Sequence, residues 1–186
     1  MSTRTVVLSA AVSNVIVVTA TCVLSGWNAT GAHAAARNSA RLSALWFALA
    51  FAAPGLTRLF GGLPAPATLV YSFFAAHCVH FATVAVLLTT FDFSHVMQNP
   101  TRAAAVVAGG FALVLVAAGT AIPSASWTYR YLHRTALYAI FLIFFFAFAR
   151  HSSKPLRVLA ALLAMSFFLR LASELRLYSP RVNSAA

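Results

Sequence analysis

The 186-residue sequence predicts an all-α integral membrane protein, built as one bundle of six transmembrane helices. Two observations lead to this fold class. Hydrophobic residues make up 61% of the chain and charged residues only 8%, a composition typical of chains whose main solvent is lipid. Long apolar runs also follow one another, separated by short stretches rich in Gly, Pro and Ser. We therefore expect a single transmembrane domain, residues 1–186, with no soluble domain.

The first three predicted spans occupy the N-terminal half of the chain. Residues 5–25 form an apolar run longer than that of a signal peptide, so we expect this helix to be retained. Residues 42–60 follow an alanine-rich connection that contains His33, and Pro54 predicts a kink or an early unwinding of this helix. Residues 67–91 follow the breaker GGLPAP and exceed the roughly 20 residues that cross the hydrocarbon core.

The last three predicted spans complete the bundle. Residues 103–122 contain Gly109 and Gly110, which permit the close approach of a neighbouring helix or of a flat ligand. Residues 131–149 follow the breaker IPSAS, and residues 156–173 follow HSSKP. Short connections make successive helices antiparallel. The third and fifth spans should therefore run in the same direction, and both termini should lie on one side.

The charge of the chain indicates its partners. The formal net charge of +11 comes from thirteen Lys and Arg against Asp92 and Glu174. Most basic residues flank apolar runs, where they anchor helix ends in the headgroup region. We therefore expect membrane lipid, and no nucleic acid, as a partner. Seven basic residues lie on the terminal side and six on the opposite side, a narrow margin that places the termini in the cytoplasm.

Histidines inside the apolar runs are the candidate functional groups. His77 and His80 lie three residues apart in the third span, and therefore on one face of its helix. A polar side chain at such a position usually faces the bundle interior and has a partner or a function. His133 stands near the start of the fifth span. Because that span runs parallel to the third, we expect His133 to face His77 or His80 at comparable depth.

Facing imidazoles without a nearby carboxylate narrow the chemistry. A zinc site normally takes three or four ligands, and a proton relay usually includes a carboxylate. A haem needs two axial ligands and apolar walls. Arg130 and Arg134, at the mouth of the fifth span, are placed to pair with haem propionates, or else to reach lipid phosphates. From spacing alone, a haem site and histidines that only hydrogen-bond across helices remain equal alternatives.

Three segments resemble the ferric reductase-like transmembrane domain family. This family includes ferric reductases, NADPH oxidases and the haem-binding membrane subunit of the bacterial periplasmic methionine sulfoxide reductase system. YLHRTALY at 131–138 resembles the element that opens the family's fifth helix. RLSALWFALAFAAPGLTRLFG at 41–61 resembles its second helix, and FFAAHCVHFATVAVLL at 73–88 resembles the third helix with its axial histidine. The likeness covers about residues 35–173, in the correct order.

The resemblance implies one haem b with His80 and His133 as axial ligands of the iron, and His77 as an alternative ligand or a neighbouring group. It implies that the chain transfers electrons across or within the bacterial inner membrane. The chain would then be the electron-transfer subunit of an oxidoreductase. We expect no catalytic nucleophile or general base. The sequence has no phosphate-binding glycine motif. Donor and acceptor would therefore be separate proteins, a flavin protein among them, or a quinone.

The sequence also departs from the family's pattern. The family's second histidine on the fifth helix follows the first by fourteen or thirteen positions, where this chain has Ala147 and Phe146. A dihaem variant would have to use His95 and His151. His151 lies eighteen residues beyond His133, about 27 Å of helix, which is long for stacked haems. The remaining alternative is a haem-free accessory or structural membrane subunit.

Overall fold

The structure, a computed structural model, describes residues 2–92, 100–121, 126–150 and 153–177. All regular secondary structure in these ranges is helical, which confirms the predicted all-α class. The elements in chain order are α1 (Thr3–Ser25), α2 (Ala29–Phe60), α3 (Pro66–Leu87), the π-helical turn η1 (Leu88–Asp92), α5 (Pro100–Ala121), α6 (Trp127–Ala149) and α7 (Lys154–Leu177).

The predicted count of six membrane spans is too high by one. Within the described residues, five helical segments are long and apolar enough to cross a membrane: α1, α2, α3 continued by η1 to Phe91, α6, and α7 to Leu175. The apolar part of α5, Val106–Ala121, is shorter. A segment of that length falls below the 20 or so residues that cross the hydrocarbon core.

The predicted start of the second helix is also corrected. The sequence placed His33 in a connection and started the helix at residue 42, but α2 begins at Ala29. The Asn28 side chain caps this end by accepting a hydrogen bond from the Gly31 N–H at 3.0 Å. Alanine has the highest helix propensity, so the alanine-rich stretch continues as helix. His33 therefore lies on α2.

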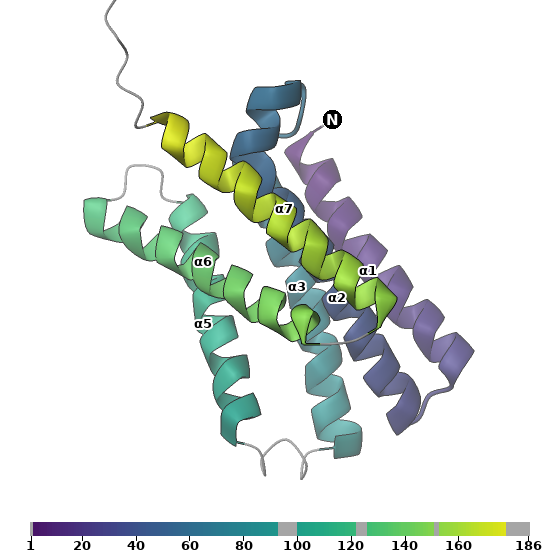
Figure 1. The fold of residues 1–186 in the computed structure, drawn as a ribbon. Helices are drawn as coiled ribbons and strands as arrows, with labels where there is room; N and C mark the ends of the chain where they lie inside the picture. Colours follow the sequence, from purple (N-terminus) through teal and green to yellow (C-terminus); the bar gives the residue numbers. More distant parts are fainter. Residues whose placement is uncertain (1, 93–99, 122–125, 151–152, 178–186) are drawn as a thin grey trace, which may run out of the picture.

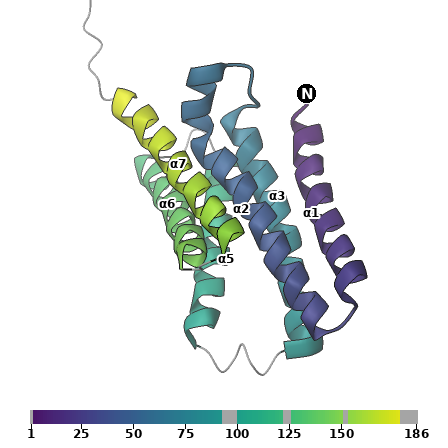
Figure 2. The same ribbon diagram turned by 45° about the vertical axis from the view of Figure 1, so that its right-hand side comes forward.

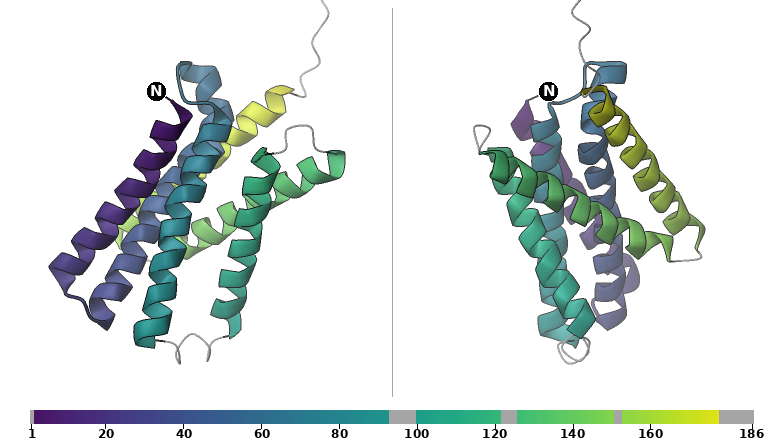
Figure 3. Two further views of the ribbon diagram at one scale, coloured as in Figure 1. Left: turned by 180° about the vertical axis from the view of Figure 1, so that it is seen from behind. Right: turned by 60° about the vertical axis from the view of Figure 1, so that its left-hand side comes forward.

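The helices form two groups that meet at α2 and α7. α1, α2 and α3 pack side by side, while α6 packs against α5 and α7 (Figures 1 and 2). α6 lies obliquely across the molecule rather than alongside α3 (Figure 3). It reaches the first group through aromatic side chains, with ring centroids 5.3 Å apart for Phe51 and Phe141 and 6.2 Å apart for Phe73 and Phe144. The described chain begins and ends on the same side of the bundle, as predicted (Figure 1).

The structure corrects the early unwinding predicted at Pro54 and the close helix packing predicted at Gly109 and Gly110, while the alternative of a kink at Pro54 stays a prediction. α2 continues as helix through Pro54 to Phe60 without early unwinding. Gly55, the residue after Pro54, lies against α7. An added Cβ at Gly55 would come 2.5 Å from the Leu169 carbonyl oxygen. An added Cβ at Gly109 or Gly110 would instead meet no described atom within 4 Å. These two glycines therefore do not mediate close helix packing.

Candidate functional site

A cavity of about 250 Å³ lies between α3, α5 and α6. α3 contributes both His77 and His80 to its wall. α5 contributes Gly109, and α6 contributes Phe144 and Ala147. Its lining is otherwise apolar, so the two imidazoles are the polar groups that could bind a ligand there. The opposite wall combines the small Gly109 and Ala147 with large apolar side chains such as Phe144.

His77 and His80 lie on one face of α3, as their spacing predicted. Their ring centroids are 5.1 Å apart, and both rings contact Phe81. The edge of the His77 ring also packs against Phe144 of α6, with centroids 5.5 Å apart. The Nδ1 atom of His77 is buried and has no hydrogen-bond partner among the described residues. A buried nitrogen without a partner is costly.

A hydroxyl group on α2 orients His80. The Oγ atom of Ser39 lies 2.9 Å from the His80 Nδ1 atom, and the same hydroxyl donates its hydrogen to the Ala36 carbonyl at 3.0 Å. Ser has a single hydroxyl hydrogen. With the hydroxyl hydrogen on Ala36, the Ser39 oxygen can accept a hydrogen bond from a His80 Nδ1–H group. In this tautomer, the Nε2 atom of His80 carries the lone pair and is available to bind a metal.

His133 is placed differently from the prediction. It is not among the described residues that line the cavity. Its Nε2 atom lies 3.3 Å from the Thr120 Oγ1 atom of α5, and Thr120 donates its own hydrogen to the Val116 carbonyl at 2.8 Å. The His133 Nε2–H group is thus the donor. The ring also packs closely on Gly119, where an added Cβ would overlap it.

The reason for this separation is depth along the helices. His80 stands fourteen residues after the start of α3 at Pro66, whereas His133 stands only six residues after the start of α6 at Trp127. The difference of eight residues corresponds to about 12 Å of helix. α6 also lies obliquely to α3 (Figure 3). Phe144 and Ala147, rather than His133, therefore oppose the α3 histidines.

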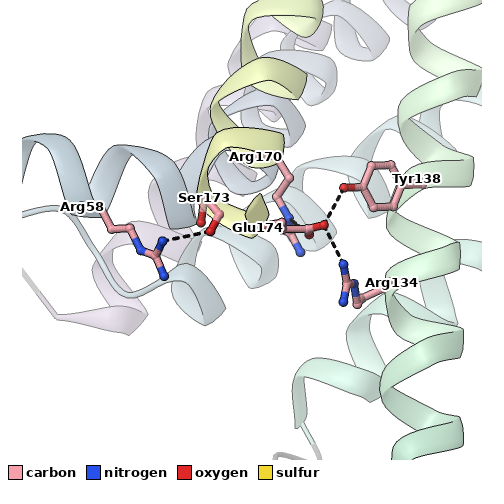
Figure 4. A network of polar contacts seen from close by, with 6 residues as sticks. All are labelled: Arg58, Arg134, Tyr138, Arg170, Ser173 and Glu174. Carbon is pink, nitrogen blue, oxygen red and sulfur yellow. Dashed lines mark hydrogen bonds and ion pairs between the residues drawn. The ribbon is translucent and has the colours of Figure 1, made fainter. Parts of the chain in front are cut away.

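Arg130 and Arg134 lie in another part of the molecule. Together with Trp127 and Tyr131 they line a groove of about 610 Å³ along the start of α6. Neither arginine is among the described residues that line the histidine cavity. One guanidinium nitrogen of Arg134 donates to a carboxylate oxygen of Glu174 in α7 at 2.6 Å (Figure 4). The position predicted for propionate contacts is thus occupied by a contact between α6 and α7.

Glu174 is the centre of a polar network that ties three helices together (Figure 4). Its second carboxylate oxygen accepts from Arg170 at 2.8 Å, and Tyr138 donates to the first at 3.1 Å. The Arg170 guanidinium lies 5.4 Å from the centre of the Phe51 ring on α2. Arg58 of α2 also donates to a backbone carbonyl of α7. The network therefore stabilises the junction between the two helix groups.

Two buried residues of the site were missed by the sequence reasoning. Ser39 was assigned to a connection, so no signal marked it. Asn14 was visible as a lone amide inside the first apolar run, where a buried polar group usually has a partner or a function. It is fully buried and donates to the Ala76 carbonyl of α3 at 2.7 Å and to Ser43 Oγ of α2 at 3.0 Å.

The side chains at the cavity can be compared with what a metal ion and what a haem require as ligands. Among the described residues there is no group of three or more His, Cys, Asp or Glu that could hold a metal ion. His80 and the apolar lining supply the imidazole and the kind of walls that a haem needs, but the cavity as it stands is smaller than common ligand pockets. The opposing wall holds no described imidazole, so the residues fit one ligand and not the expected pair. His95 and His151 lie outside the described residues.

The fold and the site thus define a helical integral membrane protein with a paired-histidine cavity. Comparison with protein-family models, with curated protein sequences and with solved structures gave no match to this chain.

Proposed function

We propose that this chain is a membrane-embedded b-type haem protein that transfers electrons to a separate acceptor. The observation that carries the proposal is His80: it lines an apolar cavity, and its Nδ1 atom lies 2.9 Å from the Ser39 hydroxyl oxygen, an arrangement that would leave the Nε2 atom to bind iron. Histidine ligands in metal sites commonly donate their other ring N–H group in this way. The resemblance to ferric reductase-like proteins supports the same chemistry.

Haem would supply one-electron redox chemistry, and the chain's residues would bind and insulate it. His80 would provide the axial nitrogen, and His77 stands one turn away as an alternative ligand or a neighbouring group. Phe81 and Phe144 would exclude water from the site. Low-polarity surroundings favour the less charged redox form and so shift the reduction potential.

The cavity must widen to accept a porphyrin. Its volume of about 250 Å³ lies below the roughly 300–1,000 Å³ of common ligand pockets. α5 packs mainly on α6 and only lightly on α3. We therefore expect α5 to move outward when haem binds. Gly109 faces this space, whereas its neighbour Gly110 is not among the residues that line it.

An absorption spectrum of the detergent-purified protein, oxidised and then reduced with dithionite, tests the proposal. We expect a b-type signal that His80→Ala abolishes. Gly109→Leu should lower haem content because it fills the cavity, while the matched control Gly110→Leu should leave it unchanged. A colourless protein from haem-replete cells would refute the proposal. If His80→Ala kept its haem and His77→Ala lost it, the axial ligand would be His77, one turn earlier on α3.

His133 as the second axial ligand stays a prediction. It would require α6 to shift along its axis by about 12 Å, or eight residues, and to release the hydrogen bond to Thr120. His133→Ala tests it directly. Loss of the haem signal would make His133 a ligand, and an unchanged signal would leave ligation to α3.

A haem-free accessory or structural subunit is the second candidate. It is favoured by the hydrogen bonds that His80 and His133 make across helices, to Ser39 and Thr120. Such bonds hold transmembrane helices together. The same spectrum separates the two candidates, because an accessory subunit of this kind would be colourless and its histidine variants would lose stability only.

Electron donor and acceptor belong to the proposal as classes of molecule. The donor would be a quinol, a flavin protein or another small reductase, and the acceptor a protein or metal ion on the other side of the membrane. We place the chain in the bacterial inner membrane with cytoplasmic termini, in line with the slight excess of basic residues on that side. Accessibility of single cysteines introduced near Thr3 to a membrane-impermeant reagent would test this orientation.

A further inference from the structure

We infer that Ser39 is a positioning residue that sets the tautomer of His80, and that Asn14 holds Ser39 in register. This inference deepens the proposed function, on which its haem-dependent part rests. Its first part concerns the protein without any ligand: His80 carries its proton on Nδ1 and presents a bare Nε2 atom to the cavity. The argument rests on a chain of hydrogen bonds that joins α1, α2 and α3.

The first step is the direction of the bond at Ser39. Ser39 is fully buried, so its hydroxyl group depends on protein partners for its hydrogen bonds. Its oxygen lies 3.0 Å from the Ala36 carbonyl and 2.9 Å from His80 Nδ1. The carbonyl can only accept. With the single hydroxyl hydrogen on this carbonyl, the serine oxygen accepts and the histidine donates at Nδ1.

The second step is the register of the helices. Asn14 of α1 is fully buried and sends its amide group to α2 and α3 at once. It donates to Ala76, one turn before His80, at 2.7 Å, and it lies 3.4 Å from the Ser39 carbonyl oxygen and 3.0 Å from Ser43 Oγ. The amide thus links the backbone beside His80 to the backbone of Ser39, which keeps the hydroxyl opposite the imidazole.

The third step is a contrast within the same chain. His133 uses the same kind of partner, a hydroxyl that donates to its own helix, but contacts it through Nε2. The two histidines are thus held in opposite tautomers. His80 presents Nε2 to the cavity, whereas Nε2 of His133 is used as a donor. This difference is a reason why His80, and not His133, suits metal ligation through Nε2 in this arrangement.

Nitrogen-15 NMR of the histidine rings in the haem-free, micelle-bound protein tests the inference. The His80 signals are assigned by their loss in His80→Ala. We expect Nδ1-protonated His80, which is the minor neutral form of free histidine, and Nε2-protonated His133 as the internal reference. Ser39→Ala should abolish the preference of His80, and Ser39→Thr should keep it. An Nε2-protonated His80 in the unaltered protein would overturn the inference without any variant.

Ser43→Ala is the matched control. Ser43 is also fully buried on α2 and contacts Asn14, but no described hydrogen bond joins it to His80. It should leave the His80 tautomer unchanged, and an equal loss in both variants would contradict a specific role for Ser39.

A haem titration tests the part that rests on the proposed function. Removing such a partner of a metal-ligating histidine typically weakens metal binding about 10–100-fold, so we expect this loss of haem affinity in Ser39→Ala. The reduction potential should rise, because the ligand becomes less basic. Ser43→Ala should match the unaltered protein in both measurements. Unaltered protein that takes up no haem would refute the proposed function alone, whereas haem binding that is equal in both variants would refute the positioning role.

Discussion

Replacing Glu174 with Gln should destabilise the junction between the two helix groups. The substitution preserves size and leaves an amide that can still contact Tyr138. It removes the negative charge that pairs with Arg134 and Arg170. The Arg170 side chain is only 13% exposed and that of Glu174 17%. Arg170 would therefore remain in a largely enclosed position without its carboxylate.

The size of the effect follows from these exposures. Breaking a buried ion pair by removing one partner costs about 3–5 kcal/mol, whereas exposed pairs contribute about 0–1 kcal/mol. This pair lies near the buried limit, but the remaining contact of Arg170 with the Phe51 ring offsets part of the loss by about 0.5–2 kcal/mol. We expect a cost of about 2–3 kcal/mol. At about 2–4 °C per kcal/mol for a chain of this size, the melting temperature should fall by about 4–12 °C.

Thermal unfolding of the detergent-solubilised protein measures this change, and two further variants separate its causes. Arg134→Gln is the matched control: its side chain is 47% exposed, so we expect a cost below about 1 kcal/mol. The double variant Glu174→Gln/Arg170→Gln should recover part of the lost stability, because no charge is left unpaired. An unchanged melting temperature in Glu174→Gln, or a double variant less stable than the sum of both changes, would refute the reasoning.

Two further predictions concern helix contacts. Gly55→Ala should destabilise the protein by about 1–3 kcal/mol, because the added Cβ would press on the backbone of Leu169. Gly110→Ala is the control, since no described atom lies within 4 Å of its added Cβ. It should be neutral or stabilise the protein by up to about 1 kcal/mol. Both are measured by thermal unfolding, and equal effects would contradict the close α2–α7 approach. Asn14→Leu should cost about 1–2 kcal/mol through lost interhelical hydrogen bonds; the Asn14 Oδ1 atom, which has no described partner, contributes nothing to this loss. Unchanged stability would show that the amide is not needed to join α1 to α3.

The histidine pair shows how far local pattern leads. A separation of three residues places His77 and His80 on one helix face in any α-helix, and the structure has both rings in one cavity. His133 required a further assumption, that parallel helices start at equal depth and lie side by side. His80 stands fourteen residues into α3 and His133 only six into α6, and α6 lies obliquely to α3 (Figure 3), so His133 does not reach the cavity of the α3 histidines.

The polar partners of the site show the same limit more sharply. Ser39 lies 41 positions before His80, and Asn14 lies 62 before Ala76. No periodicity connects residues at such separations. Glu174 was noticed as one of two acidic residues, but its pairing with Arg134 depends on how α6 meets α7.

Composition and helical periodicity were enough to predict the lipid surroundings of this protein, its helical class and the helix face that carries His77 and His80. These follow from composition and from the 3.6-residue period, which are local properties. The tertiary structure alone decided which groups share a cavity, which nitrogen of each histidine is left to bind a ligand, and that the arginines of α6 pair with Glu174. These depend on the depth, tilt and rotation of each helix, which are set by side-chain packing between segments far apart in the chain.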